Sequence, residues 1–196
     1  MTKVTTANRA IKARVKASAS RIQSDIQNDF AIVDQIIVDN NILHLASNEE
    51  LDVNDLPTGQ LSVPLGLWLE NKEAIKARGD KVAVQIAADE NPMDLETDLG
   101  EIDIVVLPFV DHVDGRAYSQ ALLLRKRYSF AGEIRAVGDV KYDQLRFLTR
   151  VGCNAFELPG SENLEAALNA FAELSEVYQP STDSARLIFS RRRAVH

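Results

Sequence analysis

The sequence predicts an α/β fold built around a parallel sheet, because short apolar runs alternate with segments of helical length. Five runs follow one another: LSVPL (61–65), KVAVQIA (81–87), IDIVVLPF (102–109), GEIRAVG (132–138) and NAFELP (154–159). Strands separated by helices indicate right-handed βαβ crossovers between parallel neighbours. About five βα units favour an open doubly wound sheet over a closed barrel, which usually needs about 250 residues. A partial TIM-like barrel is the alternative.

The segments between these runs carry helix start and stop signals. Helices are expected over 67–79, 116–128 and 142–152. Gly79 and Gly152 end the first and the last of them, as glycine commonly does. A short helix is expected to start at Asn91-Pro92, where Asn caps and Pro suits the first turn. Ser161 is expected to cap a final helix.

The chain before the alternation divides into two parts. Residues 30–45 (FAIVDQIIVDNNILHL) predict a β-hairpin around Asn40-Asn41. Residues 1–29 are basic and rich in Ala, Ser and Thr, which favours a flexible or helical extension, and a transit peptide has the same composition. The tail 181–196 is also basic. We therefore expect a single α/β domain over 30–180 between these two segments.

Composition and charge exclude several classes of protein. The net charge of −7 divides into +4 over residues 1–29, −12 over 30–110 and +1 over 111–196, and the acidic part argues against nucleic-acid binding. The longest near-apolar run is too short to span a bilayer. One cysteine, Cys153, excludes an intramolecular disulfide and a cysteine metal cluster. We expect a cytoplasmic protein that binds neither nucleic acid nor membrane.

Polar loops follow two of the predicted strands at their carboxyl ends, where parallel α/β sheets bind ligands. The loops after 102–109 and 132–138 contain Asp114, Arg116, Asp139, Asp143 and Gln144. We predict that the site lies at these two ends.

Three arginines are candidate ligands for a small oxyanion, which guanidinium groups bind by charge-assisted hydrogen bonds. Arg116 and Arg125 lie on one predicted helix, and Arg135 lies inside a strand. Asp114 and Gln144 would take part in the same site. In the structural alternative, Asp114 only caps the helix beside a solvated Arg116.

Arg135 has a structural alternative of its own. A guanidinium inside a strand needs a carboxylate or a bound anion to offset its desolvation. Asp139 and Asp111 are the candidate partners for an ion pair.

Asp139 and Asp143 are the candidate catalytic residues, as a general base or as ligands of a hard cation. Their structural alternative is a helix cap and a first-turn acid. His112 beside Asp111 could form a proton-transfer pair, although a lone loop histidine is more often incidental. Cys153 precedes an apolar strand, which favours a buried, inert thiol.

Familiar cofactor fingerprints are absent from the sequence. It contains no G-x-G-x-x-G, no G-x-x-x-x-G-K-[ST], no C-x-x-C, no H-E-x-x-H and no G-x-S-x-G. No metal site is predicted, and the identity of any cofactor stays open.

The stretches DGRAYSQALLLRKRY (114–128) and GEIRAVGDVKYDQLRFLTRVGCNAFEL (132–158) resemble an uncharacterised bacterial family, domain of unknown function 934. The resemblance is densest over 108–158. The matching residues are Asp114, Gly115, Arg116, Ser119, Arg125, Tyr128, Gly132, Arg135, Ala136, Gly138, Asp139, Asp143, Gln144, Gly152 and Phe156. The family pattern Arg-Cys-Gly-Phe-Asp is replaced here by RVGCN (150–154), which weakens any mechanism that needs a cysteine before the glycine.

Members of this family are described as oxidoreductases involved in sulfite reduction, because they are encoded beside assimilatory sulfite reductase. The resemblance therefore implies an oxidoreductase or accessory protein of sulfur assimilation, with sulfite reductase or its electron donor as partner. It brings no established reaction, so enzymatic status stays open. The alternative is a non-catalytic adaptor that docks to the reductase or the donor.

Overall fold

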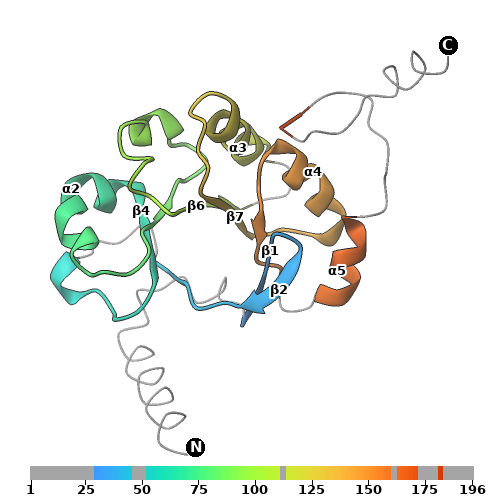
Figure 1. The fold of residues 1–196 in the computed structure, drawn as a ribbon, viewed down its shortest axis with the longest axis horizontal. Coiled ribbons are helices and arrows are strands. Elements are labelled where there is room, and N and C mark those ends of the chain that lie inside the picture. Colours follow the sequence, from blue (N-terminus) through green and yellow to red (C-terminus); the bar gives the residue numbers. More distant parts are fainter. Residues whose placement is uncertain (1–28, 46–51, 111–113, 160–162, 172–180, 183–196) are drawn as a thin grey trace, which may run out of the picture.

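The computed structural model describes residues 29–45, 52–110, 114–159, 163–171 and 181–182. In this part of the chain eight strands form one mixed sheet, in the order β2-β1-β8-β7-β6-β5-β4-β3 (Figure 1). Their bounds are β1 Phe30–Val33, β2 Ile36–Asp39, β3 Leu43–His44, β4 Leu61–Pro64, β5 Ala83–Gln85, β6 Ile104–Phe109, β7 Glu133–Gly138 and β8 Ala155–Phe156. The expected extension 1–29 and tail 181–196 lie outside the described residues except for residues 29, 181 and 182.

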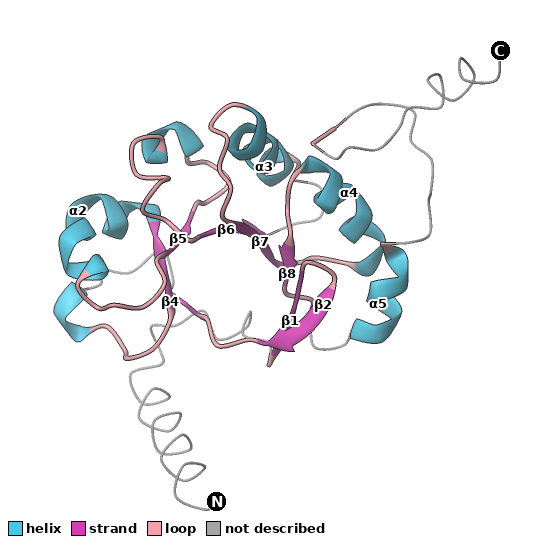
Figure 2. Cartoon of the chain, in the orientation of Figure 1, coloured by secondary structure: helices cyan, strands magenta, loops and turns pink. Residues whose placement is uncertain are grey.

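The strands β3 to β8 are all parallel and lie in sequence order. Each new strand joins the same edge, whereas a doubly wound sheet reverses direction partway. The sheet curls into half a barrel, with the helices around its outside (Figure 2). The alternative of a partial barrel fits this arrangement, and the open doubly wound sheet does not.

The structure does not confirm the expected count of five βα units. A sixth parallel strand, β3, pairs with β4 through Leu43–Leu61 and His44–Ser62. Only a short 3-10 helix, η3 (Pro92–Leu95), lies between β5 and β6. Its side-chain cap is Asn91, as the Asn-Pro pair predicts.

The hairpin is present, but its turn lies earlier than expected. β1 and β2 pair antiparallel and are joined at Asp34 and Gln35, whose φ values are 47° and 65°. Positive φ at both central residues matches the twist of a two-residue hairpin. Asn40 and Asn41 instead lead into β3, so the expectation of a turn there is wrong. Sequence reasoning missed the turn because Asp-Gln is not one of the favoured dipeptides.

The remaining helices are η2 Val53–Asp55, α2 Leu65–Lys76, α3 Arg116–Lys126, η4 Tyr142–Gln144, α4 Leu145–Val151 and α5 Leu164–Ala170. Gly152 ends α4 with a φ of 119°, as expected. The cap of α5 is Asn163, whose side chain accepts from two backbone N–H groups. The expected cap, Ser161, lies outside the described residues. No described helix has both the length and the apolar composition required to cross a membrane.

The outer face of the sheet and the helices share the main core, which includes Trp68, Leu107 and Phe156. Successive strand residues point to opposite faces, so the alternate positions form the inner face of the curl. A smaller apolar cluster lies there: Ile42, Ala83, Ile104, Val106 and Val137. The other inner positions are largely polar, and several of them form part of the candidate functional site.

Candidate functional site

The carboxyl ends of β6 and β7 lie together, as the sequence predicts. Phe109 and Gly138 are register partners at these ends, and the Asp139 N–H donates to the Phe109 carbonyl at 2.7 Å. Asp114 and Arg116 lie where α3 begins. Asp111 and His112 lie outside the described residues.

Arg116 is bound to a neighbouring carboxylate. Its Nη2 lies 2.7 Å from Asp114 Oδ2, and Asp114 also accepts from the backbone N–H of Arg116. These hydrogen bonds lower the pKa of Asp114 to about 2. The Arg116 side chain remains 60% exposed, so its outward edge is accessible from solvent.

Arg125 occupies a different environment, between α3 and the sheet. Its guanidinium donates to the carbonyls of Gly152 (2.8 Å), Phe130 (2.6 Å) and Gly132 (2.7 Å), and to Asn154 Oδ1 (3.0 Å). Burial lowers its pKa. These contacts tie the end of α3 to the segments that flank β7 and β8.

Asp143 and Gln144 both lie on η4. Asp143 is exposed, and the Gln144 side chain accepts from the Lys141 N–H at 3.1 Å. Asp139 is partly buried just beyond β7. A catalytic role for either aspartate stays a prediction.

Arg135 points to the inner face, away from the other two arginines. Its Nε lies 2.6 Å from Glu133 Oε1, and its Nη1 lies 2.9 Å from both Glu157 Oε1 and Asn40 Oδ1. Arg135 thus has the kind of ion pair that a strand arginine requires. Its described carboxylate partners are Glu133 and Glu157, which sequence reasoning did not single out.

Glu157 also binds His44, which comes from the far edge of the parallel part of the sheet. His44 Nε2 lies 3.1 Å from each carboxylate oxygen, and the two residues are 2% and 0% exposed. β3 and β8 are not neighbours in the sheet. The curl is therefore what brings these side chains together.

Three further polar atoms lie unpartnered on this face. His44 Nδ1, Ser62 Oγ and Gln85 Oε1 are buried and have no hydrogen-bond partner within the described chain. An unsatisfied buried polar group costs about 1–3 kcal/mol, and it is a candidate contact for a ligand. We call His44, Ser62, Gln85, Arg135 and Glu157 the interior polar cluster.

The interior polar cluster lies in the inside of the curl and not at its carboxyl edge. His44 and Ser62 share a row of the sheet with Ile104, the first residue of β6. Gln85 and Arg135 share the row of Val106, in the middle of β6. The sequence carried one usable signal for this cluster, because His44, Ser62, Gln85 and Glu157 are polar residues inside otherwise apolar runs.

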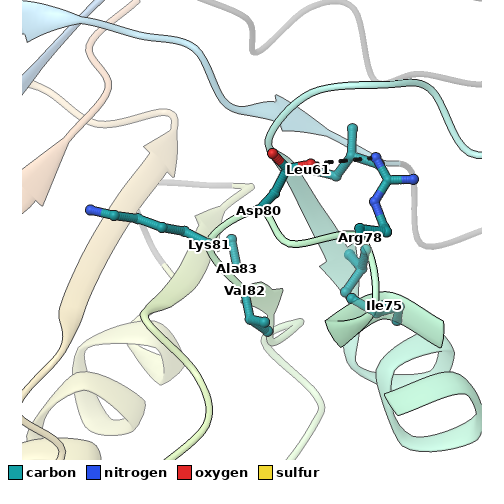
Figure 3. Close-up of a pocket in the computed structure, with 8 residues that line it drawn as sticks. Leu61, Ile75, Arg78, Asp80, Lys81, Val82 and Ala83 are labelled. Carbon is teal, nitrogen blue, oxygen red and sulfur yellow. Dashed lines mark ion pairs between the residues drawn. The ribbon is translucent and has the colours of Figure 1, made fainter. Parts of the chain in front are cut away.

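A surface hollow of about 250 Å³, part of it open to solvent, lies at the amino ends of β4 and β5 (Figure 3). It is lined by Leu61 and Val82 near the starts of β4 and β5 and by Arg78 and Asp80. Arg78 lies 3.9 Å from Asp80 and donates to the Pro57 carbonyl at 2.6 Å. The position of the hollow and the bonds that Arg78 makes within the protein favour a structural role for Arg78.

Within the described residues, no group of three or more His, Cys, Asp or Glu side chains is arranged to hold a metal ion. Cys153 is buried, and desolvation raises the pKa of its thiol to about 12, as expected for an inert thiol.

The fold and site define an α/β protein with a half-barrel sheet and a buried polar interior. A family model described as "bacterial protein of unknown function (DUF934)" matches residues 83–189. The chain therefore belongs to this family, which confirms the resemblance seen in the sequence. No curated protein matches the chain.

Proposed function

We propose that the protein is an accessory protein of assimilatory sulfite reduction that acts in the cytoplasm beside sulfite reductase or its electron donor. The pathway rests on the resemblance over residues 114–158, because the family model itself carries no function. The contacts of the candidate residues bear on whether such a protein would act by docking or by binding sulfite directly.

Docking is the mode of action that the geometry favours. Each arginine considered as an oxyanion ligand already has protein partners: Arg116 binds Asp114, Arg125 binds mainly carbonyls, and Arg135 binds two glutamates. An incoming sulfite would have to displace these contacts or share them. This argues for an adaptor rather than a preformed sulfite site.

One surface feature carries the docking proposal. Phe147 on α4 is 53% exposed, and its ring lies 5.3 Å from that of Tyr118 on α3. Tyr118 in turn contacts Phe109 at the end of β6, at 5.1 Å between ring centres. Tyr142 on η4 is also half exposed. Exposed aromatic side chains held on a rigid scaffold are common anchors of protein interfaces.

A pull-down with purified sulfite reductase and with its electron donor tests this mode. The change Phe147→Ala is expected to weaken capture of one of them by at least about tenfold, as loss of an interface anchor does. The matched control is Leu69→Ala, because Leu69 is an exposed apolar residue on another helix, α2. Equal capture by both variants would contradict docking through Phe147.

The second candidate is an oxidoreductase that binds a small oxyanion directly. Arg116 favours it, because this arginine is exposed at the carboxyl edge of the sheet, where α3 begins. Asp139 and Asp143 would then supply acid–base chemistry. Calorimetry with sulfite and sulfate tests direct binding of the oxyanion. Binding heat that disappears in Arg116→Met supports this function, and no heat at millimolar ligand contradicts it.

The pathway is tested separately from the mode of action. A strain that lacks the gene is expected to fail to grow on sulfate or sulfite and to grow normally on cysteine or sulfide. Normal growth on every sulfur source would remove the assignment to sulfite reduction.

A further inference from the structure

We infer that the interior polar cluster is a binding site for a small cation of the ammonium class. The inference goes beyond the role in sulfite reduction and does not depend on it. It rests on three unpartnered buried atoms, on their proximity and on the charge around them.

The free atoms are mainly acceptors of hydrogen bonds. The Glu157 carboxylate can only accept, so His44 Nε2 donates to it, and in the neutral form of the imidazole Nδ1 is then an acceptor. Gln85 Nε2 donates to the Leu45 carbonyl at 3.4 Å, which leaves Oε1 as the free acceptor. The hydroxyl of Ser62 can accept as well as donate. A ligand that satisfies all three atoms must therefore bring several donors.

These atoms belong to neighbouring strands on one face. His44 and Ser62 are register partners on β3 and β4. Gln85 on β5 extends past β4 to the carbonyl of Leu45, the residue next to His44. Pro64, which pairs with Gln85, has no backbone N–H or polar side-chain atom that could satisfy Gln85 Oε1.

The charge of the surroundings favours a cation over an anion. Arg135 brings one positive charge, whereas Glu133 and Glu157, both bound to it, bring two negative charges. An oxyanion would face excess negative charge and acceptor atoms. A transition metal would find one imidazole and no described cluster of ligands. An ammonium group offers N–H donors and the complementary charge.

The test is a titration of the full chain, labelled with ¹⁵N-histidine, with methylammonium chloride. The His44 ring signals are identified by elimination, using His112→Gln and His196→Gln. The expected result is a saturable shift of the His44 Nδ1 resonance at millimolar methylammonium, which sodium chloride at equal ionic strength does not produce. An absent or unsaturable shift overturns the inference, and so does the same shift with sodium sulfite.

Two variants separate a ligand contact from a structural residue. Ser62→Ala removes an unpartnered hydroxyl, so it is expected to weaken methylammonium binding about tenfold while leaving the melting temperature unchanged or higher. Ser119→Ala, at an exposed serine of α3, is the matched control and should bind normally. Gln85→Met repeats the test at the second acceptor. Unchanged affinity in both Ser62→Ala and Gln85→Met overturns the site.

Discussion

The outer and inner faces of the curled sheet are buried to a similar degree, but their chemistry differs. The outer face packs apolar side chains such as Leu107 in one core with helix residues such as Trp68. The inner face buries His44, Arg135 and Glu157 in one network. Apolar packing needs only matching shapes, whereas a buried ion pair must offset a large desolvation cost. The comparison indicates that the outer face provides stability and the inner face has a more specific task.

Two consecutive residues at the end of β8, Phe156 and Glu157, point to opposite faces of the sheet. Phe156 points outward into the main core and contacts the ring of Phe171, with 5.6 Å between ring centres. Glu157 points inward to Arg135 and His44. Substitutions at these two positions therefore test the two faces at almost the same point in the chain.

The largest effect is expected on the outer face, from Phe156→Ala. Loss of a fully buried phenyl ring leaves a cavity and should lower the free energy of unfolding by about 3–5 kcal/mol. Urea denaturation followed by circular dichroism measures it. Phe147→Ala, at an exposed ring, should change stability far less. Similar losses in both variants would contradict the assignment of Phe156 to the core.

On the inner face, Glu157→Ala removes the shared partner of Arg135 and His44. The buried His44 Nε2 loses its carboxylate partner, and Arg135 keeps only Glu133 and Asn40. This should cost about 3 kcal/mol of unfolding free energy, measured in the same way. The control is Glu101→Ala, because Glu101 pairs with Lys76 at the surface, at 3.0 Å. If Glu157→Ala and Glu101→Ala lower the free energy of unfolding by the same amount, water reaches the interior and the contrast between the faces disappears.

Arg125→Met tests the contact between α3 and the sheet. Methionine keeps most of the aliphatic stem but loses the four described hydrogen bonds to Gly152, Phe130, Gly132 and Asn154. The expected loss is about 2–4 kcal/mol in urea denaturation. Arg116→Met is the control and should leave stability nearly unchanged, because Arg116 is exposed. A stable Arg125→Met variant would free Arg125 for a functional role.

The smallest effect concerns Asp114, at the surface and outside both faces. Its pKa of about 2 lies below the ordinary 3.8 because Arg116 donates to it. A lowered pKa stabilises the fold above the ordinary value, and this contribution is lost as the pH falls from about 4 to about 2. NMR titration should show the low midpoint, and Arg116→Ala should move it toward 3.8. An unchanged midpoint would mean that Arg116 does not hold the carboxylate.

The parallel strands and most helices could be predicted, because local signals define them: apolar runs, an Asn-Pro start, and glycine stops such as Gly152. The winding of the sheet could not, since five βα units fit several strand orders. The site was predictable only at the carboxyl edge, where loops carry visible charges. The contact between His44 and Glu157 depends on the curl of the sheet, because the two residues are 113 positions apart in the sequence. No local sequence pattern predicts it.

The antiparallel pairing of β1 with β8 has a consequence for the order of folding. Ile32 finds its partner in Phe156, and Asp34 contacts Asn154 from 120 positions away. During synthesis the N-terminal hairpin leaves the ribosome long before its neighbour in the sheet exists. Contacts of such long range form slowly and leave strand edges open in the meantime. The nascent chain must therefore keep the other edge of β1, the one not paired with β2, open or shielded by another protein until β8 has been translated.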